Sequence, residues 1–231
     1  GIEFRLRGNG VDKTGTTSNG GIAVFDNLKP GIYSVTEEFL EHYIPNSIQN
    51  VTIVSGQTSI VNFSNTLKRG NLQVKKTSKD NIVEGLEFKL TGTSMSGETI
   101  EQYAVTNSSG IATFKNVLVS GKVKYVLTEI NVPDKYEPPK AVSVDIKWNE
   151  TTQVTVENKL KVGSIEIKKT SEDGKIHGVQ FSYSGTALCG KKYSGRLQTS
   201  SKGYCYMSNF PISGNEPYVI TEQYDISSYY E

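Results

Sequence analysis

Two short segments recur three times along the chain in the same order, and this repetition constrains the fold more than any other feature. The first segment, Gly-apolar-(Glu/Gln)-Phe, begins at Gly1, Gly85 and Gly178. The second segment starts with Tyr, ends in Thr-Glu, and begins at Tyr33, Tyr125 and Tyr218. Self-similarity at a regular period indicates that the chain is built from copies of one structural unit.

The spacing between matched residues predicts one complete unit between two partial ones. Lys76 precedes Glu129 by 53 positions, and Lys169 precedes Glu222 by the same interval. By the same spacing, the first unit's lysine would fall before the start of the chain and the third unit's last asparagine beyond its end. We therefore expect a first unit without its first strand, a complete middle unit, and a third unit without its last strand. The expected boundaries are 1–69, 70–161 and 162–231.

The repeated segments have the pattern of β-strands. They are four to eight residues long, rich in Val, Ile, Tyr, Phe and Thr, and they alternate apolar with polar residues. Gly- and Asn-rich stretches separate them as turns. No segment keeps a 3.6-residue apolar period over the length of a helix. The sequence therefore predicts an all-β fold of tandem Ig-like or prealbumin-like Greek-key β-sandwiches, with about seven strands in the complete unit.

Charge and hydropathy argue against several classes of function. The chain has 25 Lys and Arg against 24 Asp and Glu, so nothing favours binding to nucleic acid or to an anionic membrane. No apolar run approaches the roughly 20 residues needed to cross a bilayer. No cluster has metal-ligand spacing, and no Ser-His-Asp set or phosphate loop is recognisable. We expect no metal, no cofactor and no enzymatic turnover.

Three polar residues of the middle unit continue rows of apolar residues. Side chains two positions apart on a strand share a face, and Lys76, Glu129 and Asn158 each end an apolar row with that spacing. A lone charge on a core face costs several kcal/mol unless it is paired. The plainer alternative places each residue at a strand end, with the lysine reaching solvent and the asparagine capping a turn. Because the same residue types recur at matched spacing, we expect the three to meet.

A lysine, a glutamate and an asparagine that meet in a dry site can form an amide. Burial lowers the pKa of a lysine and raises that of a glutamate, which favours the neutral amine and the neutral acid. The amine can then attack the carboxamide carbon while the acid polarises its oxygen and relays protons until ammonia leaves. Such a bond is made once and is not turned over.

The units resemble the Cna B-type (SpaA-like, prealbumin-fold) domains of Gram-positive surface adhesins and pilins. The resemblance rests on the Val-Lys-Lys-Thr-Ser segment at 74–78, the two repeated segments above, and the terminal asparagine of the last strand. In that family a lysine on the first strand joins an asparagine on the last, assisted by Glu or Asp. The family often has Asp where Ser78 and Ser171 stand, so the choice of Lys76 over Lys75 rests on strand parity.

The resemblance implies a role for each matching residue. The implied reactive lysines are Lys76 and Lys169, the implied acceptors are Asn158 and Asn65, and the implied assisting acids are Glu129, Glu222 and Glu37.

Cys189 and Cys205 are the only two cysteines, and both belong to the third unit. Their spacing of 16 residues suggests neighbouring strands and a hairpin-spanning disulfide in an exterior compartment. The alternative is a pair of unreacted buried thiols. Tyr204-Cys205-Tyr206 resembles the cysteine motif of Gram-positive thioester domains, but alignment with the middle unit places Cys205 on an ordinary repeat strand.

The resemblance implies the structural stalk of an extracellular adhesin or pilin, stabilised by Lys–Asn isopeptide bonds. Attachment to the cell wall would then use a C-terminal signal outside this chain. The alternative is a module that binds a host matrix protein or glycan through its loops, without a crosslink. Tyr224, Tyr229 and Tyr230 are expected at the edge of the third sandwich.

Overall fold

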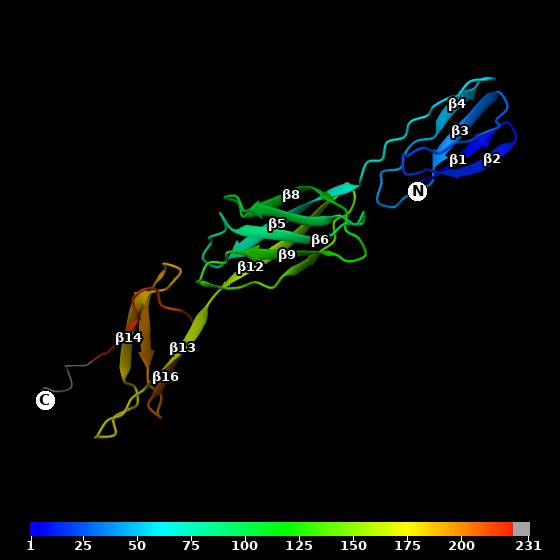
Figure 1. Cartoon of the computed structure of the whole chain (residues 1–231). Helices are drawn as coiled ribbons and strands as arrows, with labels where there is room; N and C mark the ends of the chain where they lie inside the picture. Colours follow the sequence, from blue (N-terminus) through cyan, green and yellow to red (C-terminus); the bar gives the residue numbers. More distant parts are fainter. Residues whose placement is uncertain (224–231) are drawn as a thin grey trace.

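The computed structural model describes residues 1–223, and all the helices and strands named within them are β-strands. Seventeen strands are present over these residues, and no helix there is long and apolar enough to cross a membrane. Figure 1 shows the strands in three groups that follow one another along an elongated molecule. Residues 224–231, with Tyr224, Tyr229 and Tyr230, lie outside the described part of the chain.

The first group is one antiparallel sheet in the order β2-β1-β3-β4. Its strands are β1 (Glu3–Gly8), β2 (Val11–Thr16), β3 (Gly31–Glu37) and β4 (Gln49–Ile53).

The middle group consists of two four-stranded sheets, ordered β10-β12-β5-β8 and β11-β9-β6-β7. The strands of the first sheet are β5 (Arg69–Ser78), β8 (Ile111–Leu118), β10 (Tyr136–Glu137) and β12 (Thr151–Leu160). Those of the second are β6 (Glu87–Thr93), β7 (Thr99–Val105), β9 (Tyr125–Ile130) and β11 (Val142–Val144).

The third group has a two-stranded sheet, β13-β16, and a three-stranded sheet, β15-β14-β17. Its strands are β13 (Val162–Lys168), β14 (Gln180–Thr186), β15 (Lys192–Gln198), β16 (Tyr204–Pro211) and β17 (Val219–Glu222).

The core of the middle group lies between its two sheets and consists of the alternating apolar residues that the sequence pattern indicates. From one sheet come Leu72, Val74, Ala112 and Phe114, and from the other Phe88, Leu90, Tyr125 and Leu127, all at most 2% exposed. Two sheets that bury one face each against the other form a β-sandwich. The predicted all-β sandwich fold is therefore confirmed.

The first and last strands of the middle group, β5 and β12, pair in parallel along eight residues. The other strand pairs of the described chain are antiparallel. The register places Val156 opposite Lys76 and Asn158 opposite Ser78. Residues opposite one another in a ladder present their side chains to the same face, so Val156 and Lys76 share a face. Asn158 is two residues after Val156 and therefore points to that face too, which is the core face.

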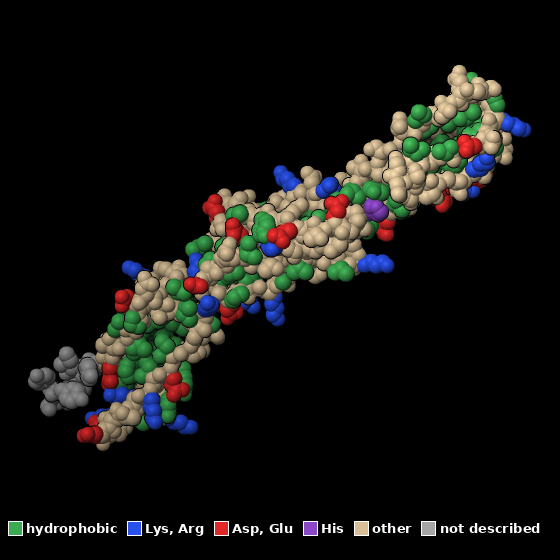
Figure 2. All heavy atoms as spheres, viewed as in Figure 1, with side chains coloured by type: hydrophobic (Ala, Val, Ile, Leu, Met, Phe, Trp, Pro, Cys, Tyr) green, Lys and Arg blue, Asp and Glu red, His purple; other side chains and the backbone are tan. Residues whose placement is uncertain are grey.

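The first group leaves apolar residues more open than the middle group does. Phe25 and Phe63 are partly exposed, whereas Phe114 and Val156 at the matching positions of the repeat are buried. In the middle group β5 lies between β8 and β12. No described strand takes this place in the first group, where segments 22–28 and 58–65 pair with nothing in a ladder. Figure 2 shows apolar side chains at the surface of the first and third groups.

A glycine packs against the ring of the repeated tyrosine in each group. At Gly92 the φ angle is +150°, and a Cβ added there would lie 2.6 Å from Cδ1 of Tyr125. Gly8 and Gly185 approach Tyr33 and Tyr218 in the same way. The hydroxyl of Tyr125 donates to the carbonyl of Leu118 at 3.0 Å, which fixes the ring over the glycine. The repeated tyrosine therefore requires a residue without a side chain beside it.

We expect Gly92→Ala to lower the free energy of unfolding of the middle group by about 1–3 kcal/mol, because the added methyl overpacks the ring of Tyr125 and the backbone angle disfavours a side chain. Urea unfolding followed by the fluorescence of Trp148, the single tryptophan, measures this change. Gly163→Ala is the control, since nothing lies within 4 Å of its added Cβ. Equal stability of both variants would contradict the packing argument.

Candidate functional site

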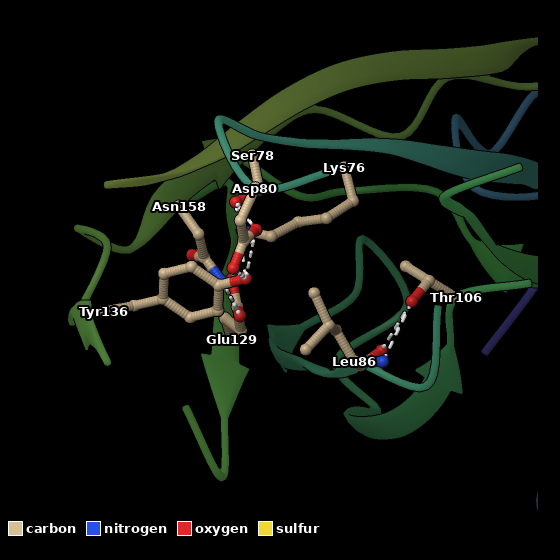
Figure 3. A network of polar contacts seen from close by, with 8 residues as sticks. All are labelled: Lys76, Ser78, Asp80, Leu86, Thr106, Glu129, Tyr136 and Asn158. Atoms are coloured by element: carbon tan, nitrogen blue, oxygen red, sulfur yellow. Dashed lines mark hydrogen bonds and ion pairs between the residues drawn. The ribbon is translucent and has the colours of Figure 1, made fainter. Parts of the chain in front are cut away.

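The structure brings Lys76, Glu129 and Asn158 together at one end of the sandwich core (Figure 3). Lys76 comes from β5, Glu129 from β9 of the facing sheet, and Asn158 from β12. Their exposed fractions are 1%, 7% and 0%. The neighbouring Lys75 is exposed and donates to the carbonyl of Ser109 at 2.7 Å. Of the two lysines, the one that strand parity favours is the one that faces the core.

Glu129 lies between the other two residues and contacts both. The ammonium of Lys76 donates to Oε2 of Glu129 at 2.6 Å, and Nδ2 of Asn158 donates to Oε1 at 2.7 Å. The side chains of Lys76 and Glu129 are fully buried in this ion pair. One carboxylate thus holds the amine and the carboxamide at the same place, as an acid that serves both groups would have to do.

Burial lowers the pKa of Lys76, and the hydrogen bond and charge of Glu129 oppose this effect. Glu157 adds a further, weaker opposing charge. Taking an ammonium out of water disfavours its charged form, so burial makes Lys76 give up its proton more readily than it would in water. The neutral amine that results is a nucleophile.

The carboxamide oxygen of Asn158 is buried and has no hydrogen-bond partner among the described residues. A buried acceptor without a donor costs about 1–3 kcal/mol. If the carboxamide group of Asn158 flips, so that its oxygen and not Nδ2 faces Glu129, a protonated Glu129 can donate to this oxygen and remove the cost. That bond would also draw electrons from the carboxamide carbon, which is the atom an amine attacks.

The first group holds the acid and the asparagine without a lysine. Asn65 donates to Oε1 of Glu37 at 2.5 Å, and Asn46 donates to Oε2 at 2.6 Å. Asn46 also contacts the carboxamide oxygen of Asn65 at 2.6 Å. Asn46 therefore bonds the carboxylate oxygen that corresponds to the partner of Lys76. The sequence patterns gave no reason to single out Asn46, because Pro139 stands at the matching position of the middle unit.

The third group holds the lysine and the acid. Lys169 contacts both carboxylate oxygens of Glu222, at 2.9 and 3.0 Å. These side chains are 22% and 23% exposed, whereas their counterparts in the middle group are fully buried. No described strand pairs with β13 in the way that β12 pairs with β5. The pair is therefore wetter than the pair in the middle group.

The two cysteines are free thiols in the structure, in place of the expected disulfide. Cys205 is buried on β16, where burial raises the pKa of its thiol. Cys189 lies in the turn after β14, a strand of the other sheet. The expectation placed them on neighbouring strands of one hairpin, and this placement is wrong. The described residues also contain no group of three or more His, Cys, Asp or Glu side chains arranged to hold a metal.

A second polar cluster lies beside Asn158 and centres on Asp80, whose side chain is 7% exposed. Its carboxylate accepts hydrogen bonds from Lys135 at 2.8 Å, Tyr136 at 2.7 Å and Ser78 at 2.5 Å. Burial alone would raise the pKa of Asp80, but these bonds and the amide of Ile82 lower it to about 2. The repeated sequence patterns did not indicate this cluster.

The recurrence of two of its residue types in the other units is a sequence signal that could have revealed part of the Asp80 cluster. Tyr136 precedes Asn158 by 22 positions, and Tyr43 precedes Asn65 by the same interval. The other half of the cluster also recurs, since Ser171 and Asp173 form the same turn contact as Ser78 and Asp80.

Sequence comparison matches residues 1–67 and 70–160 to the SpaA family, described as a prealbumin-like fold domain. The chain belongs to this family. The two matched segments cover more than half of the chain. The repeated strands had already indicated a resemblance to this family. No curated protein matches the sequence.

Several solved structures are similar to the chain. The Bacillus anthracis TIE protein has 23% sequence identity and a TM-score of 0.69, over 97% of this chain and 42% of its own. The minor pilin GBS52 of Streptococcus agalactiae has 19% identity and a TM-score of 0.36, over 74% of this chain and 87% of its own. The shaft pilin SpaA of Lactobacillus rhamnosus GG has 14% identity and a TM-score of 0.34, over 67% and 87%. The likeness to the Bacillus protein supports the fold, and this chain spans less than half of that protein's length.

The pKa of Asp80 predicts an acid-dependent part of the stability. Because this pKa is about 2 in the fold and 3.8 for a free carboxyl, its contribution is complete above pH 3.8 and is lost as the pH falls through 2. The difference corresponds to about 2 kcal/mol. We expect Asp80→Asn to lower the free energy of unfolding at pH 7 and to approach the wild type near pH 2. Urea unfolding over a series of pH values tests this, and a difference that stays constant with pH would contradict it.

Proposed function

We propose that this chain is a structural stalk segment of a cell-surface pilin or adhesin, whose middle unit seals itself through an amide bond between Lys76 and Asn158. The observation that carries this proposal is the position of Glu129. Its carboxylate accepts hydrogen bonds from both the buried amine of Lys76 and the buried carboxamide of Asn158.

The reaction needs no component from outside the site. Lys76 transfers a proton to Glu129, and the neutral Nζ attacks the carboxamide carbon of Asn158 while Glu129 donates to the oxygen. Glu129 then carries a proton from the attacking nitrogen to Nδ2 of Asn158. The bond from the carbon to Nδ2 breaks, ammonia leaves, and an amide remains. A fixed near-attack geometry can contribute about 7–11 kcal/mol to such a reaction.

The proposed bond would stabilise the unit and carry force. Lys76 and Asn158 are 82 positions apart, and closing a loop of this size removes about 4–5 kcal/mol of unfolded-state entropy in the chain-entropy model. Tension applied to the two ends of the unit would pull the parallel strands β5 and β12 past each other. The amide resists this sliding covalently, and reductants do not break it.

Membership of the SpaA prealbumin-like family and the serial arrangement of the three groups support the stalk role (Figure 1). The division into units at 1–69, 70–161 and 162–231 belongs to the same proposal. We place the protein outside the cell, attached to the wall through segments outside this chain, with a structural role and no turnover.

The alternative proposal is a binding module whose loops hold a host matrix protein or glycan. Binding of such a ligand by an uncrosslinked chain, lost when the loops are substituted, would favour it.

The intact mass of the chain should be about 17 Da below the sequence mass, because one ammonia leaves for each bond formed. One bond is expected, since among the described residues the middle unit alone brings lysine, glutamate and asparagine together. Digestion followed by mass spectrometry should yield a branched peptide that joins Lys76 to Asn158. An unchanged mass in folded protein would exclude the bond and leave the stalk role standing.

Glu129→Ala should abolish the mass loss while the fold remains, because the variant lacks the group that takes the proton from Lys76 and polarises Asn158. Circular dichroism reports the fold and intact mass reports the bond. The matched control is Glu222→Ala, which removes the acid that pairs with Lys169 and should leave the 17 Da loss of the middle unit intact. Full crosslinking in Glu129→Ala would remove Glu129 from the mechanism.

A further inference from the structure

The side chain of Tyr136 passes over Asn158. Tyr136 lies on β10 opposite Leu160, and Asn158 is two residues before Leu160 on the same face of β12. The hydroxyl of Tyr136 reaches Oγ of Ser78 at 3.3 Å, and Ser78 lies opposite Asn158 on β5. In the sheet order β10-β12-β5, two strand spacings, about 9–10 Å, separate the backbones of Tyr136 and Ser78. The Tyr136 side chain and its hydrogen bond to Ser78 bridge this distance and therefore cross β12 next to Asn158. Figure 3 shows the ring beside Asn158 and Glu129.

Asp80 anchors the far end of this ring. Its two oxygens accept the hydroxyl of Tyr136 at 2.7 and 2.9 Å. Lys135 holds Asp80 at 2.8 Å and stacks its ammonium 4.9 Å from the centre of the Tyr136 ring. The backbone amide of Ile82 also donates to Asp80, at 3.2 Å. The ring is thus held by its strand at one end and by a buried carboxylate at the other.

From this geometry we infer that Tyr136 is a positioning residue for the crosslink, which Asp80 locks across Asn158 so that water stays out and the carboxamide faces Lys76 and Glu129. The inference rests on the proposed function and adds a residue to it. Tyr136 is 1% exposed and Asn158 is 0% exposed, which is the state that a dry site requires.

The two halves of this arrangement recur in the other units at the repeat spacing. Tyr43 forms a bridge to Leu67, as Tyr136 does to Leu160, and Asn65 precedes Leu67 by two residues. Ser171 and Asp173 repeat the contact of Ser78 with Asp80. The middle unit joins both halves. The tyrosine recurs with the acceptor asparagine, and the aspartate recurs with the strand of the reactive lysine. This pattern fits a role of the tyrosine and the aspartate in joining that lysine to that asparagine.

The experiment follows crosslinking during refolding. The full chain is purified from inclusion bodies in urea, diluted into buffer, and sampled over time. Intact mass gives the rate of the 17 Da loss expected from the condensation, and Trp148 fluorescence gives the rate of folding separately. The variants are Tyr136→Phe, Tyr136→Ala and Asp80→Asn. Asp173→Asn is the control, because it removes the matching aspartate of the third unit.

We expect Tyr136→Phe and Asp80→Asn to fold and to crosslink several-fold more slowly, since the ring remains but loses its lock. Tyr136→Ala should slow crosslinking by about 10- to 100-fold, the order of loss that a small misplacement of reacting groups produces. Asp173→Asn should match the wild type.

The pH dependence separates positioning from stability. In Tyr136→Ala water enters the site and weakens the desolvation that lowers the pKa of Lys76, so this pKa rises. The pH at which the crosslinking rate of the variant is half-maximal should therefore be higher than in the wild type. The charges that act on the pKa of Lys76 are those of Glu129, its ion-pair partner, and of the exposed Glu157, and both remain in this variant. A purely structural role for Tyr136 would lower the melting temperature and leave this pH unchanged.

The mass of the wild-type chain distinguishes failure of the proposed crosslink from failure of the inference about Tyr136. If the wild type folds without losing 17 Da, the crosslink itself is wrong, and the inference falls with it. If the wild type crosslinks and Tyr136→Phe, Tyr136→Ala and Asp80→Asn crosslink at its rate with its pH profile, the inference alone is overturned.

Discussion

A buried lysine ammonium is tolerated only beside an opposite charge, and in the middle unit Glu129 supplies that charge to Lys76. The two residues come from different sheets, so the pair also fixes how the sheets stack at this end of the core. Asn158 completes the arrangement by using the second oxygen of the same carboxylate. Removing Glu129 takes the hydrogen-bond acceptor from both the buried amine and the buried carboxamide, and removing either of those leaves one buried carboxylate oxygen without its donor. This shared dependence is why the three belong to one site.

Much of this site could be predicted from the sequence, because strand periodicity is a local property. Lys76, Glu129 and Asn158 each extend an apolar row, and their repetition in other units distinguished them from ordinary strand-end residues. Parity also separated Lys76 from Lys75. What parity cannot supply is the register between strands, which decides that Asn158 lies opposite Ser78 and within reach of Lys76.

The Asp80 cluster could not be predicted in the same way. Asp80 and Tyr136 are 56 positions apart, lie in a turn and on a two-residue strand, and continue no apolar row. Their contact depends on how β10 lies against β12. The cysteine prediction was wrong for a related reason, since sequence spacing suggested one hairpin, whereas Cys205 lies on β16 and Cys189 lies in the turn after β14, a strand of the other sheet. Asn46 takes a polar contact at Glu37 that only the folded loop brings within reach.

The parallel pairing of β5 and β12 has a consequence for the length of the molecule under load. A sandwich of this kind that unravels at its ends would release the chain between Lys76 and Asn158, 82 residues, or about 280 Å of extended backbone at roughly 3.3–3.6 Å for each residue. With the proposed amide in place, tension enters along β5, crosses at Lys76 and leaves along β12, and this stretch of chain carries none of it. The unit then behaves as a link of fixed contour length, and a tether made of such links transmits a pull without lengthening.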